Sequence, residues 1–282
     1  MSKRSAVSIC LSIVFSMVVI FGISGAQEKK TYTVAVIPQS QIGEIFERWT
    51  PFLKKLSAVS GIEFELKPYN TIKQFEEDLF KGVPDFAYMN PHETLEAKKS
   101  QGYVPLVRDK GDLVGILVVH KGKGINSVKD LNGKEIAFPA PNAFAASLYL
   151  RALLAEKEKI SFTPFYAKTH GNVYRTVILD KAAAGGGASK TLMKEPDEIK
   201  NQLTVIYETP STASHPISAH SRVPDAVRKK VAKAVLEMAQ DKANEAILKN
   251  IAMPNPVAAN FNKDYMPLMK IGVNVQKYME NE

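Results

Sequence analysis

Residues 32–56 have the sequence YTVAVIPQSQIGEIFERWTPFLKKL, which predicts a strand followed by a helix. The first seven residues are mostly β-branched or aromatic, and the run ends at Pro38, as strands commonly do before a turn. The apolar residues that follow recur at spacings of three and four, the period of one helix face. They are Ile42, Ile45, Phe46, Trp49, Phe52, Leu53 and Leu56. A strand that leads into a helix is the building unit of α/β folds.

The same order recurs along the chain. Further β-rich runs are IEFELKPY (62–69), PDFAYMN (84–90), LVGILVVHKG (113–122), EIAF (135–138), ISFTPFYAKTH (160–170) and LTVIYET (203–209). Helical spacing follows most of them, as in the stretch after Phe138 and in the helix expected from Gly171 to Lys181. This alternation predicts largely parallel sheets flanked by helices.

The N-terminus differs from the rest of the chain. Lys3 and Arg4 precede an uncharged, largely apolar stretch that ends in Ser24-Gly25-Ala26. A basic head, an apolar centre and small residues before the cut predict a secretory signal over residues 1–26, cleaved after Ala26. The alternative is an uncleaved anchor, because the apolar run approaches the roughly 20 residues that span a bilayer.

Composition excludes several classes of function. The 282 residues are 45% hydrophobic and 23% charged, which is ordinary for a globular chain of one or two domains. The single cysteine, Cys10, lies in the predicted signal, so the mature chain would have no disulfide, thiolate metal site or cysteine nucleophile. The formal charge of +8 falls to +6 without Lys3 and Arg4, and no basic and aromatic stripe indicates nucleic acid.

Motifs for catalysis or metal binding are weak. GGGASKT at 185–191 has Ser189 where a P-loop has glycine before its lysine, and small residues there suit a strand packed near a cleft. His120, His215 and His220 lack metal-ligand spacing, and no GxSxG elbow is present. We therefore expect no catalytic residue, no metal and no cofactor.

Four blocks carry a resemblance to a known family. They are VIPQSQIGEIFERWTPFLKKLSAVSGIEFEL (36–66), GVPDFAYMNPHETLEA (82–97), INSVKDLNGKEIAFPAP (125–141) and THGNVYRTVILDKAAAGGG (169–187). In this order they resemble the phosphate, phosphite and phosphonate-binding branch of periplasmic solute-binding proteins, the receptors of ABC importers. The resemblance implies an α/β fold of the type II-like class, with a ligand cleft between two Rossmann-like lobes.

The resemblance also implies how the chain is divided. Residues 27–115 would form the first segment of lobe 1, residues 116–205 lobe 2, and residues 206–282 the return segment of lobe 1 with C-terminal helices. The two crossings between the lobes would fall near Leu113 to Val119 and near Thr204 to Thr209. A chain that leaves one α/β unit, completes another and returns creates a cleft where the carboxyl ends of both sheets meet.

Candidate ligand contacts follow the predicted strand ends. Gln39 and Ser40 follow the first strand, where Ser40 has the alternative of capping the next helix. Tyr88 and Asn90 end the strand in PDFAYMN, where Tyr88 has the alternative of a core aromatic. His170 matches a histidine that lines the oxyanion pocket in phosphonate-binding members, and we expect a neutral N–H donor because it lies at a helix start. Tyr174 follows one turn later.

The loop before residue 149 departs from the family pattern. Phosphonate-binding members typically carry a Ser-Thr-Ser-Gly-type run there, whereas this chain has Ala143, Phe144, Ala145 and Ala146. Asn142, Ala143, Phe144 and Ala145 are candidate ligand contacts in this loop. Backbone N–H groups at the helix start would still attract an anion. Phe144 indicates either a ligand with an apolar part or a residue within the lobe core.

The sequence therefore predicts a periplasmic receptor that binds a small molecule and delivers it to an ABC permease in the inner membrane. We expect a monomer. A receptor that reports to a membrane histidine kinase and a small exported enzyme are the alternatives, and turnover rather than stoichiometric binding would identify the enzyme.

Overall fold

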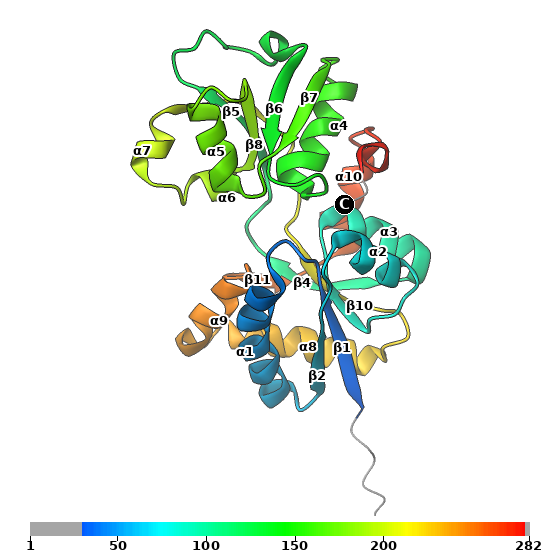
Figure 1. Cartoon of the computed structure of the whole chain (residues 1–282). Helices are drawn as coiled ribbons and strands as arrows, with labels where there is room; N and C mark the ends of the chain where they lie inside the picture. Colours follow the sequence, from blue (N-terminus) through cyan, green and yellow to red (C-terminus); the bar gives the residue numbers. More distant parts are fainter. Residues whose placement is uncertain (1–29, 280–282) are drawn as a thin grey trace, which may run out of the picture.

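The structure is a computed structural model that describes residues 30–279 (Figure 1). The predicted signal peptide, residues 1–26, lies outside the described residues. Every helix among the described residues is too short or too polar to cross a bilayer.

Two separate sheets organise the chain, each with helices packed on it (Figure 1). The first sheet has the strand order β11-β4-β10-β3-β1-β2 and the second has the order β7-β6-β8-β5-β9. The elements leading up to the first crossing are β1 (Thr31–Val36), α1 (Ile42–Ser60), β2 (Glu63–Lys67), α2 (Ile72–Phe80), β3 (Phe86–Tyr88), α3 (Pro91–Gln101) and β4 (Val104–Asp109). The two lobes built on these sheets are the α/β arrangement that the sequence predicts.

The second lobe is one continuous stretch of chain. Its elements are β5 (Gly115–His120), the 3₁₀ helix η1 (Val128–Leu131), β6 (Lys134–Phe138), the π-helix η2 (Phe144–Leu148), α4 (Tyr149–Glu156), β7 (Phe162–Tyr166), α5 (His170–Ile178), β8 (Ala184–Ala188), α6 (Ser189–Leu192), α7 (Asp197–Lys200) and β9 (Leu203–Glu208). Strands β7, β6 and β8 run parallel, while β5 pairs antiparallel with both β8 and β9.

The chain then returns to the first lobe. The return elements are β10 (Pro216–Ala219), α8 (Asp225–Met238), η3 (Lys242–Asn244), α9 (Glu245–Asn250), β11 (Pro256–Ala258), the π-helix η4 (Phe261–Tyr265), α10 (Met266–Met269) and the 3₁₀ helix η5 (Val275–Tyr278). Strand β10 lies between β3 and β4 and pairs antiparallel with both. The first sheet therefore contains strands from two distant segments of the sequence.

Helix α1 buries most of the face that its spacing predicts. Trp49, Phe52 and Leu56 are buried, with the Phe52 side chain fully enclosed in the core of the first lobe. Ile42 and Phe46 are instead 39% and 42% exposed, although they belong to the same predicted face. The apolar face that the spacing predicts is therefore buried only in part.

Strand β5 is apolar throughout because both of its faces are covered. Ile116 and Val118 pack with α5 on one face, whereas Leu117 and Val119 pack with α4 on the other. Successive side chains of a strand point to opposite faces, so a strand buried on both sides shows no polar alternation. Strand β8 is likewise buried, and it consists of alanine and glycine alone.

The small residues of the second sheet allow a helix start to approach closely. A Cβ atom built on Gly186 would lie 2.3 Å from the Ala146 carbonyl oxygen, and one on Gly115 would lie 2.2 Å from that of Ala145. Only glycine leaves room for these backbone atoms. The start of η2 is therefore seated directly on β5 and β8, which fixes the loop that precedes it.

Residues 110–114 and 209–215 connect the lobes. Leu113 and Thr212 exchange two backbone hydrogen bonds, of 2.8 and 3.0 Å, so the crossing segments pair as a short antiparallel ribbon. The Thr209 backbone N–H donates to the Gly115 carbonyl at 2.8 Å where the second lobe begins. The lobe limits expected after residues 115 and 205 lie near these segments and stay a prediction about which parts move as rigid bodies.

Candidate ligand-binding cleft

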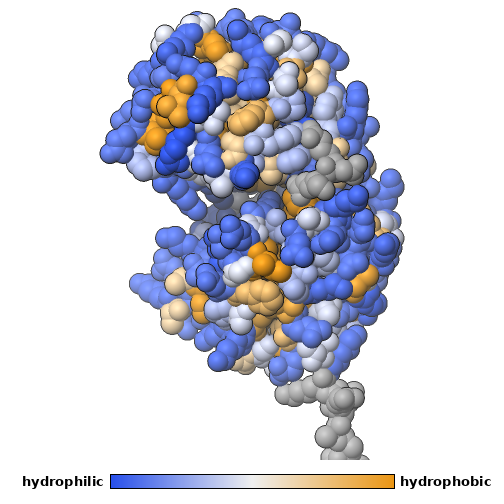
Figure 2. Space-filling view, in the orientation of Figure 1, coloured by the Kyte–Doolittle hydropathy of each residue, from blue (hydrophilic) through white to orange (hydrophobic). Residues whose placement is uncertain are grey.

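The molecule is hollowed between its lobes (Figure 2), and the parallel strands of both sheets end toward this space (Figure 1). Loops at the carboxyl ends of parallel strands are where α/β proteins place their ligands.

Three side chains from the first lobe form a contiguous group. The Tyr88 ring, at the end of β3, stacks on His215 with ring centroids 5.4 Å apart and planes 24° apart. The Gln39 amide nitrogen lies 3.2 Å from Nε2 of His215. An amide nitrogen can only donate, so Nε2 accepts and the imidazole proton is on Nδ1. Gln39 and Tyr88 are thus brought together by His215, a residue that the sequence did not single out.

His215 is held in place by its neighbours on both sides. The Ser214 hydroxyl donates to the Asp109 carbonyl at 2.7 Å, and the Met89 N–H donates to the Pro216 carbonyl at 3.3 Å. Burial lowers the pKa of His215 to about 4, so the ring is neutral at physiological pH. Burial also raises the pKa of Tyr88, with a smaller contribution from the charge of Asp109. Both groups are therefore uncharged hydrogen-bonding partners.

Asn90 and Ser40 have local structural settings. Asn90 caps α3: its Oδ1 accepts from the Glu93 N–H at 2.8 Å, and a Glu93 carboxyl oxygen accepts from the Asn90 N–H at 2.8 Å. Burial raises the pKa of Glu93 well above its usual range, and the charge of Glu76 raises it further by a smaller amount. Ser40 is partly exposed and does not cap α1, whose N-cap residue is Gln41.

His170 lies at the first position of α5 in a hydroxyl network. Its Nδ1 is 3.3 Å from the Thr191 hydroxyl, which is also 2.8 Å from the Tyr174 hydroxyl. The Thr191 hydroxyl donates its one proton to the Ala188 carbonyl at 2.7 Å, and the Ala188 N–H lies 3.3 Å from the same hydroxyl oxygen. His170, Tyr174 and the Ala188 N–H thus surround a hydroxyl that has two lone pairs. Burial lowers the pKa of His170, which keeps it neutral.

The loop after β6, residues 139–143, is named the cleft loop here. Ala143 is partly exposed, whereas Asn142 and Ala145 are buried. The Phe144 ring is 1% exposed and stacks on Tyr149 with centroids 5.4 Å apart and planes 6° apart. This geometry assigns Phe144 to an apolar cluster, as the second of the two sequence interpretations has it, rather than to an open face for a ligand ring.

One ion pair joins the lobes beside the crossing segments. Nζ of Lys190, in α6, lies 3.3 Å from an Asp109 carboxyl oxygen at the end of β4. Asp109 is 3% exposed and also accepts from the N–H groups of Gly111 and Asn255, at 3.0 and 2.9 Å. Lys190 is the residue before Thr191 in the chain, and its ammonium group reaches across to Asp109 of the first lobe.

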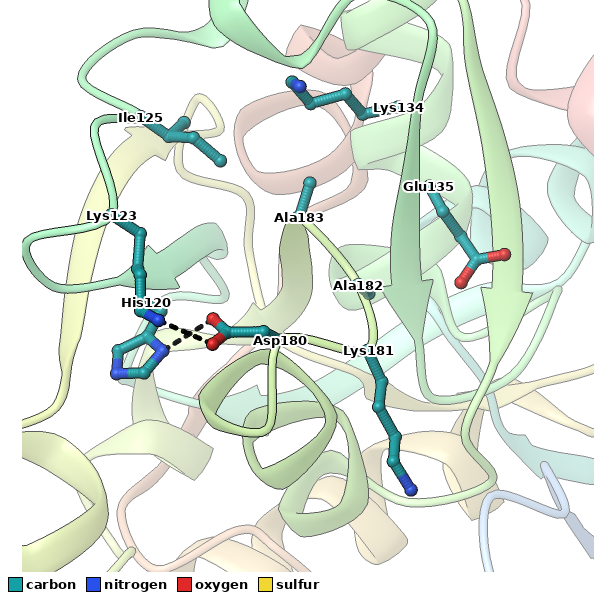
Figure 3. Close-up of a pocket in the computed structure, with 9 residues that line it drawn as sticks. All are labelled: His120, Lys123, Ile125, Lys134, Glu135, Asp180, Lys181, Ala182 and Ala183. Carbon is teal, nitrogen blue, oxygen red and sulfur yellow. Dashed lines mark hydrogen bonds and ion pairs between the residues drawn. The ribbon is translucent and has the colours of Figure 1, made fainter.

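A second hollow lies far from the cleft, at the opposite end of β5. Its rim holds Asp180 between His120 and Lys123, at 2.9 and 2.7 Å (Figure 3). These side chains come from the ends of β5 and α5 that point away from the first lobe. The charges pair with one another at the surface, and the residues expected to bind ligand lie elsewhere.

The sequence-predicted residues thus fall into groups. Gln39 and Tyr88 meet in the first lobe, and His170 and Tyr174 meet in the second, while Asn90 serves as a helix cap. His215, Thr191 and Lys190 complete these groups and were missed. The side chains that they contact lie more than 15 residues away along the chain, so no local spacing indicates them.

Comparisons with known proteins agree with this architecture. The family described as "ABC transporter, phosphonate, periplasmic substrate-binding protein" matches residues 34–265. The phosphate-import protein PhnD of Mycolicibacterium smegmatis is 22% identical over 213 residues, which are 68% of this chain and 66% of that protein. This chain therefore spans just under two thirds of the length of that relative.

Solved structures show the same fold. PhnD1 from Prochlorococcus marinus, in complex with methylphosphonate, has a TM-score of 0.72 and 16% identity, covering 86% of this chain and 97% of that chain. A binding protein component of an ABC phosphonate transporter from Pseudomonas aeruginosa has a TM-score of 0.69 and 13% identity, covering 86% of each chain. The two-lobed type II fold is confirmed by this likeness. From its sheets, its crossings and the match over residues 34–265, the chain belongs to the family of phosphonate-type periplasmic substrate-binding proteins of ABC transporters.

Proposed function

We propose that this chain is the extracytoplasmic receptor of an ABC importer and that it holds a small acid of the oxyanion type between its lobes. The observation that carries the proposal is the pair of polar groups at facing strand ends: Gln39, Tyr88 and His215 in one lobe, His170 and Thr191 in the other. Membership of the family implies a small-molecule ligand and a membrane permease.

The protonation of these groups bears on the kind of acid. Both histidines are neutral because burial lowers their pKa values. A neutral imidazole has one N–H donor and one acceptor nitrogen, so His170 can bind a ligand oxygen that carries a proton, whereas Nδ1–H of His215 suits an acceptor oxygen. Lys190 can supply positive charge, but it is paired with Asp109. A singly charged acid fits this set better than a dianion does.

Ala143, Ala145 and Ala146 have methyl groups where relatives of the phosphonate-binding type carry hydroxyls. Each good hydrogen bond to a charged group contributes about 1.5–3 kcal/mol, so the loss of two lowers affinity by about a hundredfold or more. Backbone N–H groups at the start of η2 remain available. We infer weak binding of the simplest oxyanions, or a ligand in which the acid is joined to a small apolar group.

Titration calorimetry tests this proposal on the mature chain with phosphate, phosphite and methylphosphonate. We expect dissociation constants weaker than about 1 μM for all of them, with tighter binding by larger phosphonates found in a thermal shift panel. For the best ligand, His170→Ala should cost at least tenfold in affinity while the melting temperature of the empty protein changes little.

His120→Ala is the matched control, because His120 lies at the end of β5 that is far from the cleft. The ligand affinity of this variant should equal that of the parent. Sub-micromolar binding of any simple oxyanion would show that the hydroxyl-free loop does not weaken binding. A panel in which no oxyanion stabilises the protein would contradict the ligand class. Turnover of a ligand would favour the enzyme alternative.

A further inference from the structure

The last described residues run from the first lobe to the second. We name residues 261–279 the C-terminal strap. Asp264 in the strap pairs with Arg108 of β4 at 3.0 Å, and the Tyr265 hydroxyl donates to the Ser214 carbonyl in the second crossing segment at 2.9 Å. Further on, the Asn274 N–H donates to the Glu156 carboxylate of α4 at 3.0 Å. Figure 1 shows the strap beside α4 and next to α3.

An apolar cluster lies beneath the strap and draws on both lobes. Its buried members come from α3, from η2 and α4, from the second crossing segment and from the strap. They are Leu95, Phe144, Ala145, Leu148, Tyr149, Ala152, Leu153, Ala213, Tyr265, Leu268 and Val275. The strap therefore adds a third connection to the two crossing segments, and this connection is held by burial rather than by the covalent chain.

The strap reaches both halves of the candidate cleft. On the first lobe, His92 lies two residues after the Asn90 cap. Its Nε2 donates to the Gln276 side-chain oxygen at 3.1 Å. On the second lobe, Nη2 of Arg151 donates to the Tyr278 carbonyl at 2.6 Å. The same nitrogen donates to the carbonyl of Pro141 in the cleft loop at 2.8 Å. Arg151 is 4% exposed, so one enclosed guanidinium group binds the strap and the loop together.

Other contacts of the cleft loop strengthen this link. The Ser147 hydroxyl donates to the Pro141 carbonyl at 3.0 Å, and the N–H groups of Ser147 and Leu148 donate to the Ala143 carbonyl at 2.9 and 3.1 Å. Phe144 lies between the cleft loop and the cluster through its stack on Tyr149. A displaced strap would therefore remove a hydrogen-bond partner of Arg151 and uncover the cluster that seats Phe144.

We propose that the C-terminal strap holds the cleft loop in place and limits the angle between the lobes, with Arg151 as the positioning residue that joins strap and loop. The proposal concerns the empty protein, so it does not depend on the identity of the ligand. A change in lobe angle has to pass through the strap contacts because Asp264 is tied to one lobe and Asn274 to the other.

Val275→Asp tests the proposal without touching the cleft loop. Val275 is 6% exposed in the shared cluster, so a carboxylate there should detach the strap from α4. Hydrogen exchange of the Ser147 and Leu148 amides should accelerate at least tenfold in the empty protein, while amides of β1 keep the parent rate. Val59→Asp is the control, since Val59 is 40% exposed on α1, and it should leave both regions unchanged.

A distance measurement addresses the lobe angle in the same variants. Cysteines placed at the exposed positions Lys54 and Lys121 can carry spin labels, because Cys10 is the one native cysteine and precedes Gln27, the predicted start of the mature chain. The distance distribution should broaden in Val275→Asp and not in Val59→Asp. Arg151→Met should accelerate the same two amides, and Arg151→Lys should restore part of the protection.

Parent-like exchange of Ser147 and Leu148 in Val275→Asp would overturn the proposal. A uniform acceleration across the whole second lobe would also overturn it, because Val275 would then merely stabilise that lobe. These measurements use no ligand, so their failure leaves the receptor function untouched. Failure of the calorimetric titrations likewise leaves the strap untouched.

Discussion

His215 keeps a neutral imidazole at the base of the cleft. It stacks on Tyr88 and accepts from Gln39, and its surroundings lower its pKa to about 4. In the unfolded chain the His215 imidazole is protonated near its ordinary pKa of 6.5, whereas in the folded chain it is protonated only near pH 4. Between these two values the unfolded state binds more protons, so folding becomes less favourable as the pH falls.

His215→Gln should therefore reduce the acid sensitivity of folding. Protonation of His215 in the unfolded chain lowers the parent's free energy of unfolding by at most about 3 kcal/mol between pH 7.5 and 4. Glutamine does not titrate, so the variant does not undergo this decrease. At pH 7.5 the variant should be less stable than the parent, because it loses the stack on Tyr88. Urea unfolding at both pH values measures the difference, and equal pH slopes for parent and variant would contradict the assigned role.

The sequence could predict some site residues and not others. His170 stands in a local pattern, a strand, a short loop and a helix start, and the structure places it there with a neutral ring. His215 reaches Tyr88 only because β10 pairs with β3, across more than 120 residues of chain. No local pattern records such a contact. Phe144 shows the same limit, since the cluster that buries it includes Leu95 and Tyr265, which are distant from it in the sequence.

At the scale of the elements, β8 and the start of η2 pack closely because Gly186 in β8 has no side chain. A methyl group on Gly186 would lie 2.3 Å from the Ala146 carbonyl oxygen and 2.5 Å from the Phe138 ring. Neither the Ala146 backbone nor the buried Phe138 ring can move aside unless the start of η2 also shifts. The run of glycines in β8, which resembles a phosphate-binding loop only in composition, serves packing at this position.

Gly186→Ala should destabilise the protein by about 1–3 kcal/mol and displace the cleft loop. Gly43→Ala is the matched control, since a Cβ there meets nothing within 4 Å and alanine favours a helix by up to about 1 kcal/mol over glycine. Urea unfolding of both variants checks the pair. A Gly186→Ala protein as stable as the parent would mean that η2 tolerates a shift away from β8.

Element types followed from periodicity, while some boundaries and the last elements did not. The helix expected from Gly171 to Lys181 runs from His170 to Ile178, and the strand expected at residues 135–138 is present as β6. C-terminal helices were expected in residues 206–282, but the contact of the strap with the second lobe could not be foreseen from residues 261–279 alone. Its short turns are stabilised by contacts with α3 and α4 rather than by their own sequence.

At the scale of the whole molecule, three connections restrain how the lobes move. The paired crossing segments form a narrow ribbon, and the shared apolar cluster lies to one side of it. Large apolar contacts between domains resist relative motion, whereas paired strands bend readily across their width. Any closure should therefore be a rotation about the ribbon that leaves the cluster packed.

Binding of the best ligand should reduce the radius of gyration measured by X-ray scattering, because the hollow between the lobes narrows. His170→Ala at the same ligand concentration should give the profile of the empty protein. The Lys190–Asp109 pair should persist on closure, since it lies beside the ribbon. An unchanged profile of the parent at saturation would mean that the ligand enters a cleft that is already closed.

The position of β10 has a consequence for the order of folding. Strands β3 and β4 are separated in their sheet by β10, which is made more than 100 residues after β4. The second lobe is continuous in sequence, so it can form as soon as β9 has been synthesised, while the first lobe waits with an incomplete sheet. Closing that long loop is slow compared with local contacts. The intermediate to expect during synthesis has a finished second lobe and an unfinished first one, whose open β3 edge is the part a chaperone would need to shield.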